Sequence, residues 1–371
     1  MKESSVKPPE RRKTRQVKVG NVTIGGDAPV RIQSMTTTHT RDVDATVAQI
    51  EQLAAAGCEM VRVACPTEED ARSLGKIKSR IKIPLIADIH FNSRFALIAL
   101  DEGVDKLRLN PGNIGKKERT VEIVEKAKKQ GVPIRIGVNG GSLEKDLMEK
   151  FGPTPEALVE SAKRHVAILE ELDFYNTIIS LKASDVPTMV AAYRLASQTF
   201  DYPLHLGVTE AGTLLRGSIY NAIGIGTLLQ EGIGDTIRVS LTAESVEEIK
   251  VGKMILEALG LRKGVRVISC PSCGRAEVDV FKLAETVESR AMKLKDPLTI
   301  SVLGCVVNGP GEAHESDFGI TGGKDKGMIY VDGKQHRVVN EDALVDELFK
   351  EIEMSRHPEA PKQPKDDKKP S

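Results

Sequence analysis

Short apolar runs alternate with longer amphipathic stretches between about residues 30 and 260. Runs of this length, rich in valine, isoleucine and leucine, are typical of strands that are covered on both faces of a parallel sheet. We predict strands at Val30–Met35, Met60–Cys65, Leu85–His90, Lys106–Asn110, Pro133–Asn139, Thr177–Ala183, Pro203–Glu210 and Thr236–Leu241. The stretches between them predict helices, such as Ala45–Ala56, Glu118–Gln130, Pro155–Leu172 and Val246–Leu259.

Glycine residues mark where several of the predicted helices end. A glycine follows several of the amphipathic stretches, and glycine takes the left-handed conformation of a helix C-cap without a steric penalty. These glycines are Gly57, Gly103, Gly131 and Gly260. Strands that alternate with helices imply right-handed crossovers and a parallel sheet. Eight such units fit a closed (β/α)8 barrel of the TIM type better than an open doubly wound sheet. No G-x-G-x-x-G motif opens the first helix, which weakens a dinucleotide-binding alternative.

The pattern changes after Gly260 and predicts a second, smaller α+β domain. Its expected elements are strands Val265–Ser269 and Leu298–Leu303, helices over about Ala276–Lys293 and Glu341–Met354, and a hairpin Met328–Val339 turning at Asp332-Gly333. A further short hairpin, Val17–Ile24, is expected ahead of the barrel. The predicted organisation is a flexible segment 1–15, a substrate-binding barrel 16–260, a cysteine-bearing domain 261–356 and a disordered tail 357–371.

Composition narrows the class of protein. Lys and Arg together number 53 and so do Asp and Glu, so no overall field attracts nucleic acid or an anionic membrane. Tryptophan is absent and aromatic residues make up 4% of the chain, which disfavours base stacking on single strands. We find no signal peptide and no apolar stretch that would span a bilayer, and we expect a cytoplasmic protein. Five cysteines in a reducing compartment favour metal ligation or catalysis over disulfides.

Three of these cysteines predict a metal centre. Cys270 and Cys273 form a C-x-x-C motif, and Cys305 follows in a glycine-rich loop that also contains Glu312. A [4Fe–4S] cluster with three thiolates leaves one iron for another ligand, for which Glu312 is the nearest candidate. The same residues, with His314 or Glu312 as fourth ligand, would also suit structural zinc, so the spacing alone leaves both open.

Cationic residues interrupt the predicted barrel strands. They are Arg62, Arg108, Arg135, Lys182 and Arg238. Any single one of them could form a structural ion pair with a carboxylate on a surrounding helix. The repetition on five strands, however, favours a binding site. Further polar residues fall at or near the carboxyl ends of the strands, where barrel active sites are built. They are His90, Asn110, Asn139, Glu210 and Ser240.

The acidic residues expected near these five cations are fewer than the cations themselves. We count Asp88, Glu210 and Asp185, and we expect Asp88 to orient a neighbouring histidine or arginine. Buried cations without partners cost several kcal/mol each, so the excess predicts a multiply charged anion such as a diphosphate. Arginine binds such an anion with two parallel hydrogen bonds. His205, on an apolar strand, is expected to be a hydrogen-bonded core histidine.

Four motifs together resemble one family. They are Ile89-His90-Phe91, Arg108-Leu-Asn-Pro-Gly-Asn-Ile-Gly115, Arg135-Ile-Gly-Val-Asn139 with Gly141-Ser-Leu-Glu-Lys145, and Gly304-Cys-Val-Val-Asn-Gly-Pro-Gly-Glu312. They resemble the 4-hydroxy-3-methylbut-2-enyl diphosphate synthases of the non-mevalonate isoprenoid pathway, in their compact two-domain bacterial form. The resemblance covers about residues 15–355.

The resemblance implies an iron–sulfur oxidoreductase acting on CH or CH2 groups. Its members reduce 2-C-methyl-D-erythritol 2,4-cyclodiphosphate by two electrons, with ring opening and loss of water. It implies a [4Fe–4S] cluster on Cys270, Cys273 and Cys305, with Glu312 on the fourth iron and Glu210 near the reacting carbons. The implied diphosphate-binding residues are Arg62, His90, Arg108, Asn110, Arg135, Asn139, Lys182, Arg238 and Ser240.

The resemblance also implies partners. Electrons would come singly from flavodoxin or ferredoxin, and a homodimer would form in which the cluster domain of one chain caps the barrel of the other. Two other classes of function stay open on the residues themselves. One is a zinc-stabilised barrel that hydrolyses or isomerises a phosphorylated metabolite, and the other is a non-catalytic iron–sulfur carrier.

Overall fold

The computed structural model describes residues 8–90, 92–114, 117–294, 296–305, 309–323 and 325–356. The predicted tail 357–371, the first seven residues of the predicted flexible segment, and the motif positions Phe91, Gly115 and 306–308 lie outside the described residues. The chain divides into two compact units between Arg262 and Lys263. Each unit is described by itself below.

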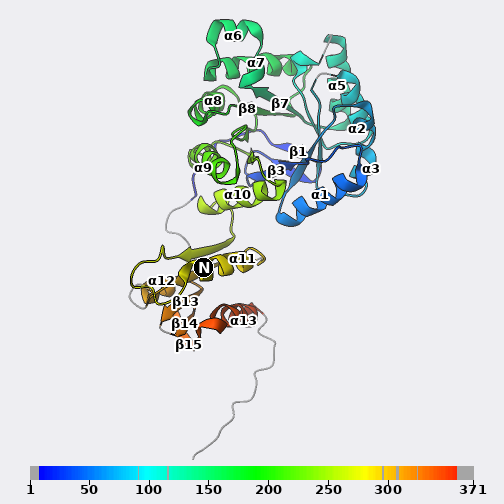
Figure 1. Cartoon of the computed structure of the whole chain (residues 1–371). Helices are drawn as coiled ribbons and strands as arrows, with labels where there is room; N and C mark the ends of the chain where they lie inside the picture. The colour runs from blue at the N-terminus through cyan, green and yellow to red at the C-terminus, as the bar shows by residue number, and fades with distance from the viewer. Residues whose placement is uncertain are drawn as a thin grey trace, which may run out of the picture. The chain divides into compact units, whose positions relative to one another are not determined.

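The larger unit is built on eight parallel strands, as the alternating pattern predicts (Figure 1). They are β3 Arg31–Met35, β4 Met60–Ala64, β5 Leu85–Asp88, β6 Lys106–Arg108, β7 Ile134–Asn139, β8 Thr177–Lys182, β9 His205–Leu206 and β10 Thr236–Ile237. Their order is β8-β7-β6-β5-β4-β3-β10-β9. A parallel bridge between Ile179 and Leu204 joins the two outer strands, so the sheet closes into a barrel.

The last two barrel strands are much shorter than the sequence predicts. β9 and β10 contain two residues each, so Glu210, Arg238 and Ser240 lie in the loops beyond them. Gly207 explains part of this difference, because a Cβ atom there would lie 2.6 Å from the carbonyl oxygen of Arg238. The backbone at Gly207 and the backbone at Arg238 lie closer together than a side chain on residue 207 would allow.

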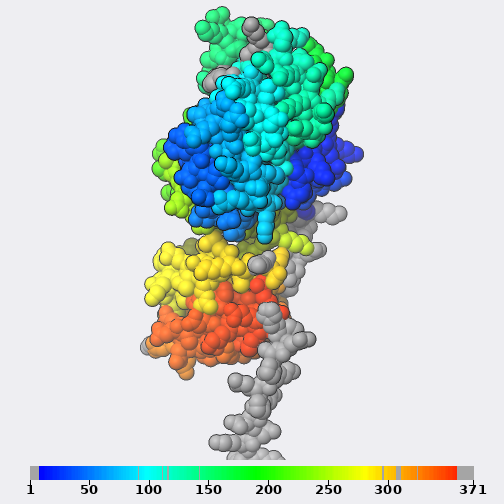
Figure 2. All heavy atoms as spheres, turned by 90° about the vertical axis from the view of Figure 1, so that its right-hand side faces the viewer, coloured from blue at the N-terminus to red at the C-terminus, as the bar shows by residue number. Residues whose placement is uncertain are grey.

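Helices surround the barrel, and Figure 2 shows that the blue and cyan part of the chain forms much of the barrel surface on the side in view. They are α1 Val43–Ala56, α2 Glu68–Arg72, α3 Leu74–Lys78, α4 Ser93–Asp101, α5 Lys117–Gln130, α6 Lys145–Phe151, α7 Pro155–Glu170, α8 Val186–Thr199, α9 Leu214–Gln230 and α10 Ser245–Ala258, with 3-10 turns η1 Pro111–Asn113 and η2 Gly140–Ser142. All four predicted capping glycines have positive φ, from 67° at Gly260 to 106° at Gly57. None of the described helices is long and apolar enough to cross a bilayer.

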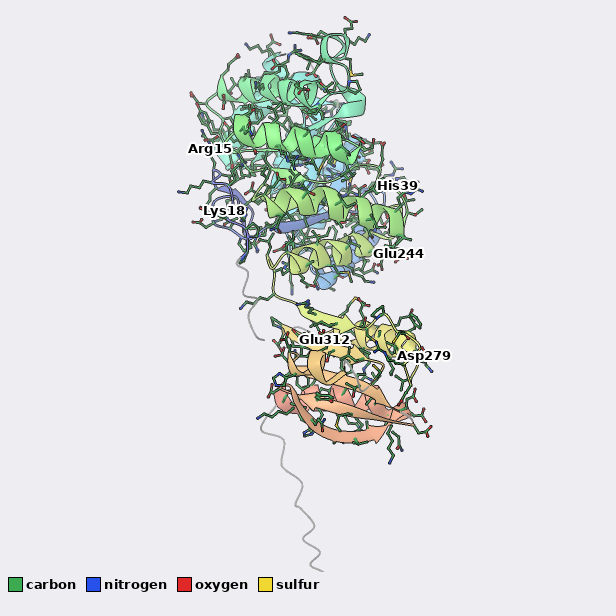
Figure 3. The ribbon with its side chains drawn as sticks, turned by 90° about the vertical axis from the view of Figure 1, so that its left-hand side faces the viewer. Arg15, Lys18, His39, Glu244, Asp279 and Glu312 are labelled. Atoms are coloured by element: carbon green, nitrogen blue, oxygen red, sulfur yellow. The ribbon has the colours of Figure 1, made fainter. Side chains whose placement is uncertain are left out.

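The predicted hairpin forms and closes one end of the barrel. Its strands are β1 Val17–Val19 and β2 Val22–Ile24. Its buried side chains pack with Met60, Ile86 and Ile178, which lie at or near the starts of their barrel strands. In Figure 3 Lys18 marks this end of the barrel, while His39 and Glu244, in loops that follow strands, mark the opposite end. The amino ends of the strands are therefore covered and the carboxyl ends carry the loops.

Residues 8–15 belong to the segment predicted to be flexible, and the structure ties them to the barrel. Arg11 donates a hydrogen bond to Asp235 at 2.7 Å, and Arg12 donates one to the carbonyl of Tyr202 at 2.7 Å. Asp235 is 1% exposed and also accepts from the backbone N–H of Leu204. These arginines satisfy buried acceptors on the barrel, a role that charge and polarity alone do not reveal.

The smaller unit is a five-stranded mixed sheet with helices. Its elements are β11 Val265–Ser269, α11 Val280–Ala291, β12 Leu298–Leu303, α12 Gly309–His314, β13 Phe318–Gly323, β14 Lys326–Val331, β15 Lys334–Asn340, η3 Glu341–Ala343 and α13 Leu344–Arg356. Both predicted strands and the hairpin at Asp332-Gly333 are present. The sequence interpretation missed β13, because its glycines obscure the strand pattern. The backbone needs them, since a Cβ atom on Gly319 would lie 2.3 Å from the Ser301 hydroxyl.

The hairpin contact generates a prediction about stability. Ile86 is fully buried against the hairpin, so Ile86→Ala is expected to lower the free energy of unfolding of the barrel by about 2–5 kcal/mol. Denaturant unfolding measures the change. Leu215→Ala is the control, because that side chain is 76% exposed and should change stability by less than about 0.5 kcal/mol. Equal effects of the two variants would contradict the packing.

Candidate active site

The five cations predicted on the strands converge inside the barrel. Arg108 ends β6 and lies beside Arg135 of β7 in the parallel register, so both side chains point to the same face of the sheet. Lys182 ends β8, and its pKa is well below the ordinary value. Burial lowers it most, followed by the positive charges of Arg62, Arg135, Arg238 and Arg108. One ammonium group therefore feels all four guanidinium groups, which places the five charges around one region.

Arg135 carries a positive charge that is buried away from solvent and has no hydrogen-bond partner among the described residues. Its side chain is fully buried, and none of its three guanidinium nitrogens has a hydrogen-bond partner among the described residues. Burial and the charges of Arg62 and Arg108 lower its pKa well below the ordinary value. Because arginine keeps its proton in proteins, Arg135 carries an unfavourable buried charge in the protein as it stands.

A sixth cation, Lys106, was missed by the sequence interpretation. It is fully buried, and its Nζ lies 3.3 Å from Gln33 Oε1. Its pKa is lowered well below the ordinary value by burial first, then by Arg135 and Arg62. A signal was available: residues 106 and 108 share one strand face because side chains alternate along a strand. An inward Arg108 therefore requires an inward Lys106.

Two carboxylates face these cations among the described residues. Asp88 lies 3.5 Å from Arg62 and 3.2 Å from Arg108. Burial alone would raise its pKa, but Arg62, a hydrogen bond with His90, and Arg108 hold that pKa below the ordinary value. This confirms the expected orienting role of Asp88. Its negative charge is shared between two arginines, so it leaves part of their charge uncompensated.

The second carboxylate is Glu248 of α10, which the sequence interpretation did not consider. It lies 3.2 Å from Arg238 and accepts a hydrogen bond from the Ser34 hydroxyl at 2.8 Å. It is 3% exposed, so this helix residue points into the barrel wall. Asp185, predicted to lie near the strand cations, instead caps α8. Its carboxylate accepts a hydrogen bond from the Thr188 N–H at 2.8 Å. Among the described residues, the six cations thus have two carboxylates as partners, Asp88 inside the barrel and Glu248 between the sheet and α10.

Hydrogen bonds hold the polar residues at the strand ends. Arg108 Nη1 lies 3.1 Å from His90 Nδ1, and its Nη2 donates to the carbonyl of Gly137 at 2.9 Å. Asn110 exchanges two hydrogen bonds with the backbone of Gly137, at 2.8 and 3.1 Å. A Cβ atom on Gly137 would lie 2.6 Å from Arg108 Nε, so glycine makes room for the guanidinium. His90, Asn110 and Arg108 are thereby brought together.

The remaining predicted residues also lie at this end of the barrel. Asn139 ends β7 and pairs with Lys182 in the register. The carbonyl of Ser240 accepts a hydrogen bond from the buried Asn221 at 3.2 Å. Glu210 is exposed and has a φ of 54°, a conformation that a residue other than glycine rarely adopts and that recurs at functional sites.

The thiols of the smaller unit lie on adjacent loops. Cys270 directly follows β11, and its N–H donates to the carbonyl of Val302 in β12. The N–H of Gly304, next to Cys305, lies 3.4 Å from Cys270 Sγ. Hydrogen bonds from Arg275 lower the pKa of Cys273, and the hydrogen bond with Cys273 followed by the negative charges of Cys273 and Cys305 raises the pKa of Arg275. All three thiols therefore belong to one loop pair, and a thiolate is favoured at Cys273.

The residue types at this loop pair suit a metal cluster that prefers sulfur. Three thiols, one with an N–H group directed at its sulfur, are the donor set that iron–sulfur clusters take. Glu312 lies on α12 and is exposed (Figure 3). In the part of the chain that the structure describes, no three His, Cys, Asp or Glu side chains are already grouped as a metal site. The assembly of the ligands therefore remains a proposal.

Comparisons with known proteins cover nearly the whole chain. The family model described as GcpE TIM-barrel domain matches residues 14–253, and that described as GcpE protein C-terminal domain matches residues 266–354. A protein of Caldanaerobacter subterraneus subsp. tengcongensis is 57% identical over 92% of this chain and 97% of its own length. One from Clostridium perfringens is 56% identical over 92% of this chain and 99% of its own length.

Both relatives are named 4-hydroxy-3-methylbut-2-en-1-yl diphosphate synthase (flavodoxin). Among solved structures, dihydropteroate synthase of Yersinia pestis matches with a TM-score of 0.47 and 12% identity, over 67% of this chain and 99% of that chain, and we draw nothing from it. The family models match both units in order, and the motif resemblance is confirmed. The chain belongs to the GcpE family, whose TIM-barrel domain and C-terminal domain correspond to the two units described above.

Proposed function

We propose that this protein reduces 2-C-methyl-D-erythritol 2,4-cyclodiphosphate to 4-hydroxy-3-methylbut-2-enyl diphosphate, as an oxidoreductase of the non-mevalonate isoprenoid pathway. The ring C–O bond to the diphosphate breaks and a hydroxyl group leaves as water, while two electrons and a proton enter. The observation that carries the proposal is the excess of positive charge in the barrel, where six cations have two carboxylates as partners and no described residue accepts a hydrogen bond from the Arg135 guanidinium. The names of the relatives agree with it.

The diphosphate is the part of the substrate that this interior suits. Its negative charges would compensate the cations that Asp88 and Glu248 leave uncompensated. As the ring opens, the departing diphosphate oxygen gains negative charge, and a preorganised cationic pocket stabilises that charge. The proposed binding residues are Arg62, His90, Arg108, Asn110, Arg135, Asn139, Lys182, Arg238 and Ser240.

Acid–base chemistry is assigned to the loop beyond β9. Glu210 is exposed there, so its carboxyl group can exchange protons with solvent. We assign it the delivery of the proton that the reduction consumes. Its positive φ, which residues other than glycine rarely adopt, supports a functional role.

The electrons require a cofactor, and the thiols of the smaller unit supply its ligands. We propose that Cys270, Cys273, Cys305 and Glu312 hold a [4Fe–4S] cluster. Bound there, the cluster would supply single electrons and a Lewis-acidic iron. The donor would be flavodoxin, which appears in the names of the relatives, or ferredoxin. We further propose a cytoplasmic homodimer in which each cluster domain serves the partner's barrel; this rests on the family resemblance alone.

Anaerobic turnover tests the whole proposal. The cyclic diphosphate is incubated with the iron-reconstituted protein and reduced flavodoxin, and the linear diphosphate is followed by phosphorus NMR. Formation of the linear product with two electrons consumed per molecule is expected. A colourless, zinc-loaded protein that hydrolyses the substrate would instead support the zinc alternative. A clustered protein that never consumes the substrate would support the carrier.

Arg135 gives a prediction that separates binding from stability. Arg135→Met removes a buried unpaired charge, so the free energy of unfolding should rise by about 1 kcal/mol or more. The same change should lower kcat/KM for the cyclic diphosphate about 100-fold. Denaturant unfolding and steady-state kinetics measure the two effects. Arg80→Met, at an exposed ion pair with Asp44, is the control and should change neither by much. A less stable but fully active Arg135→Met would refute the role of Arg135.

The ligand set gives a second prediction. Cys305→Ser should lose the cluster, because a serine hydroxyl binds iron less firmly than a thiolate. Glu312→Gln should keep the cluster, because all three thiolates remain, and should slow turnover. Iron and sulfide analysis after anaerobic reconstitution measures the first effect and turnover measures the second. Cys58→Ala, in the core of the barrel, is the control and should retain full iron. A complete cluster in Cys305→Ser would remove that residue from the ligand set.

A further inference from the structure

His165 of α7 is a buried histidine to which the proposed function assigns no role. Its side chain is 3% exposed. Its Nδ1 accepts a hydrogen bond from the backbone N–H of Gly112 at 3.1 Å. On its other side, Nε2 lies 3.5 Å from Glu144 Oε1. One imidazole ring thus contacts two separate segments of the chain, η1 and the residue preceding α6.

Both segments follow strands that carry proposed binding residues. Gly112 comes two residues after Asn110, whose side chain is hydrogen-bonded to Gly137 of β7. Glu144 comes five residues after Asn139, the last residue of β7. Figure 1 shows α6 and α7 side by side near β7, consistent with this link. His165 therefore connects the loop after β6 to the loop after β7.

The loop after β6 lies tightly against the imidazole ring. A Cβ atom on Gly112 would lie 2.8 Å from His165 Cε1 and 3.0 Å from Nδ1. Real Cβ atoms essentially never come this close to another heavy atom. Glycine at this position lets the backbone N–H reach the ring directly, and any side chain there would push the loop away. The short Pro-Gly-Asn turn of the motif is thereby explained by contact with α7.

The hydrogen bond requires neutral histidine with its proton on Nε2. Burial lowers the pKa of His165, more than the charge of Glu144 raises it, and Arg164 lowers it further. Arg164 is itself paired with Asp146 at 2.7 Å, which moderates its effect. At neutral pH the ring is therefore uncharged. Nδ1 accepts from Gly112, and the Nε2–H faces the Glu144 carboxylate.

We propose that His165 is a positioning residue that holds the two loops of Asn110 and Asn139 in the arrangement that binds the diphosphate. The inference rests on the proposed function. His165 itself touches no substrate in this scheme. It acts through Gly112 and Glu144, so its loss loosens binding and leaves the electron transfer chemistry unchanged. The expected signature is a higher KM with little change in kcat.

Two isosteric replacements test the proposal. In His165→Asn the amide oxygen takes the place of Nδ1 and keeps the Gly112 hydrogen bond. In His165→Gln the amide group takes the place of Nε2 and the Gly112 hydrogen bond is lost. We expect Gln to raise KM for the cyclic diphosphate about 10-fold with kcat within about twofold, and Asn to restore KM to within about threefold of the original. Lys163→Gln, on the exposed face of the same helix, is the control.

Other outcomes overturn the proposal. If both variants lose stability alike and KM stays constant while kcat falls, His165 is only a packing residue. Gly112→Ala tests the same contact without changing a side chain of α7, since φ at Gly112 is not positive and the atoms nearest to the added methyl group belong to the ring and to Ile168. The same rise in KM is expected there, and an unchanged KM would refute the proposal even if His165→Gln fails to fold.

A readout without substrate separates this inference from the proposed function. Hydrogen exchange of the Gly112 amide should be at least about 10-fold faster in His165→Gln than in His165→Asn, because only the second keeps an acceptor for it. Equal exchange would overturn the proposal. If the exchange differs as expected but the original protein does not consume the cyclic diphosphate, the contact stands and the assigned substrate fails.

Discussion

The structure of the barrel depends on one electrostatic constraint, a buried guanidinium group to which no described residue offers a hydrogen-bond acceptor. Arg135 lies fully inside the barrel, close enough to Arg62 and Arg108 for their charges to lower its pKa. Such an arrangement is unfavourable in an empty protein, and arginine does not relieve it by releasing its proton. The cost is offset by the surrounding fold and would be recovered when a polyanion binds. The buried charge thus lowers the stability of the barrel, as is common at sites that bind a charged ligand.

The rest of the barrel makes this arrangement possible. The β1–β2 hairpin covers the amino ends of the strands with apolar side chains, while the loops that carry the polar residues leave the carboxyl ends. Asp88 and Glu248 compensate enough charge to hold the arginines in fixed directions. His165 then links the loops that leave β6 and β7. Rigid strands place the charges, and a few buried polar contacts place the loops.

The smaller unit brings its thiols together through the parallel pairing of two strands. Its parallel strands β11 and β12 end together, so the loops that follow them meet at one edge of the sheet. The thiols of Cys270 and Cys305 come from these two loops, and Arg275 favours the thiolate form of Cys273. Glycines in β13 allow its backbone to lie close against β12. The sheet therefore brings together residues that are far apart in the chain, as a soft-metal site requires.

The sequence by itself determined the barrel, the order of its strands and five of its interior cations, because hydrophobic periodicity and charged residues within strands are local signals. It also indicated the capping glycines and the three thiols. Only the tertiary structure decided that Glu248 of α10 pairs with Arg238, that Asp185 is a helix cap, and that His165 joins two loops. These roles depend on which residues meet across different elements. Such long-range contacts leave no periodic trace in the chain.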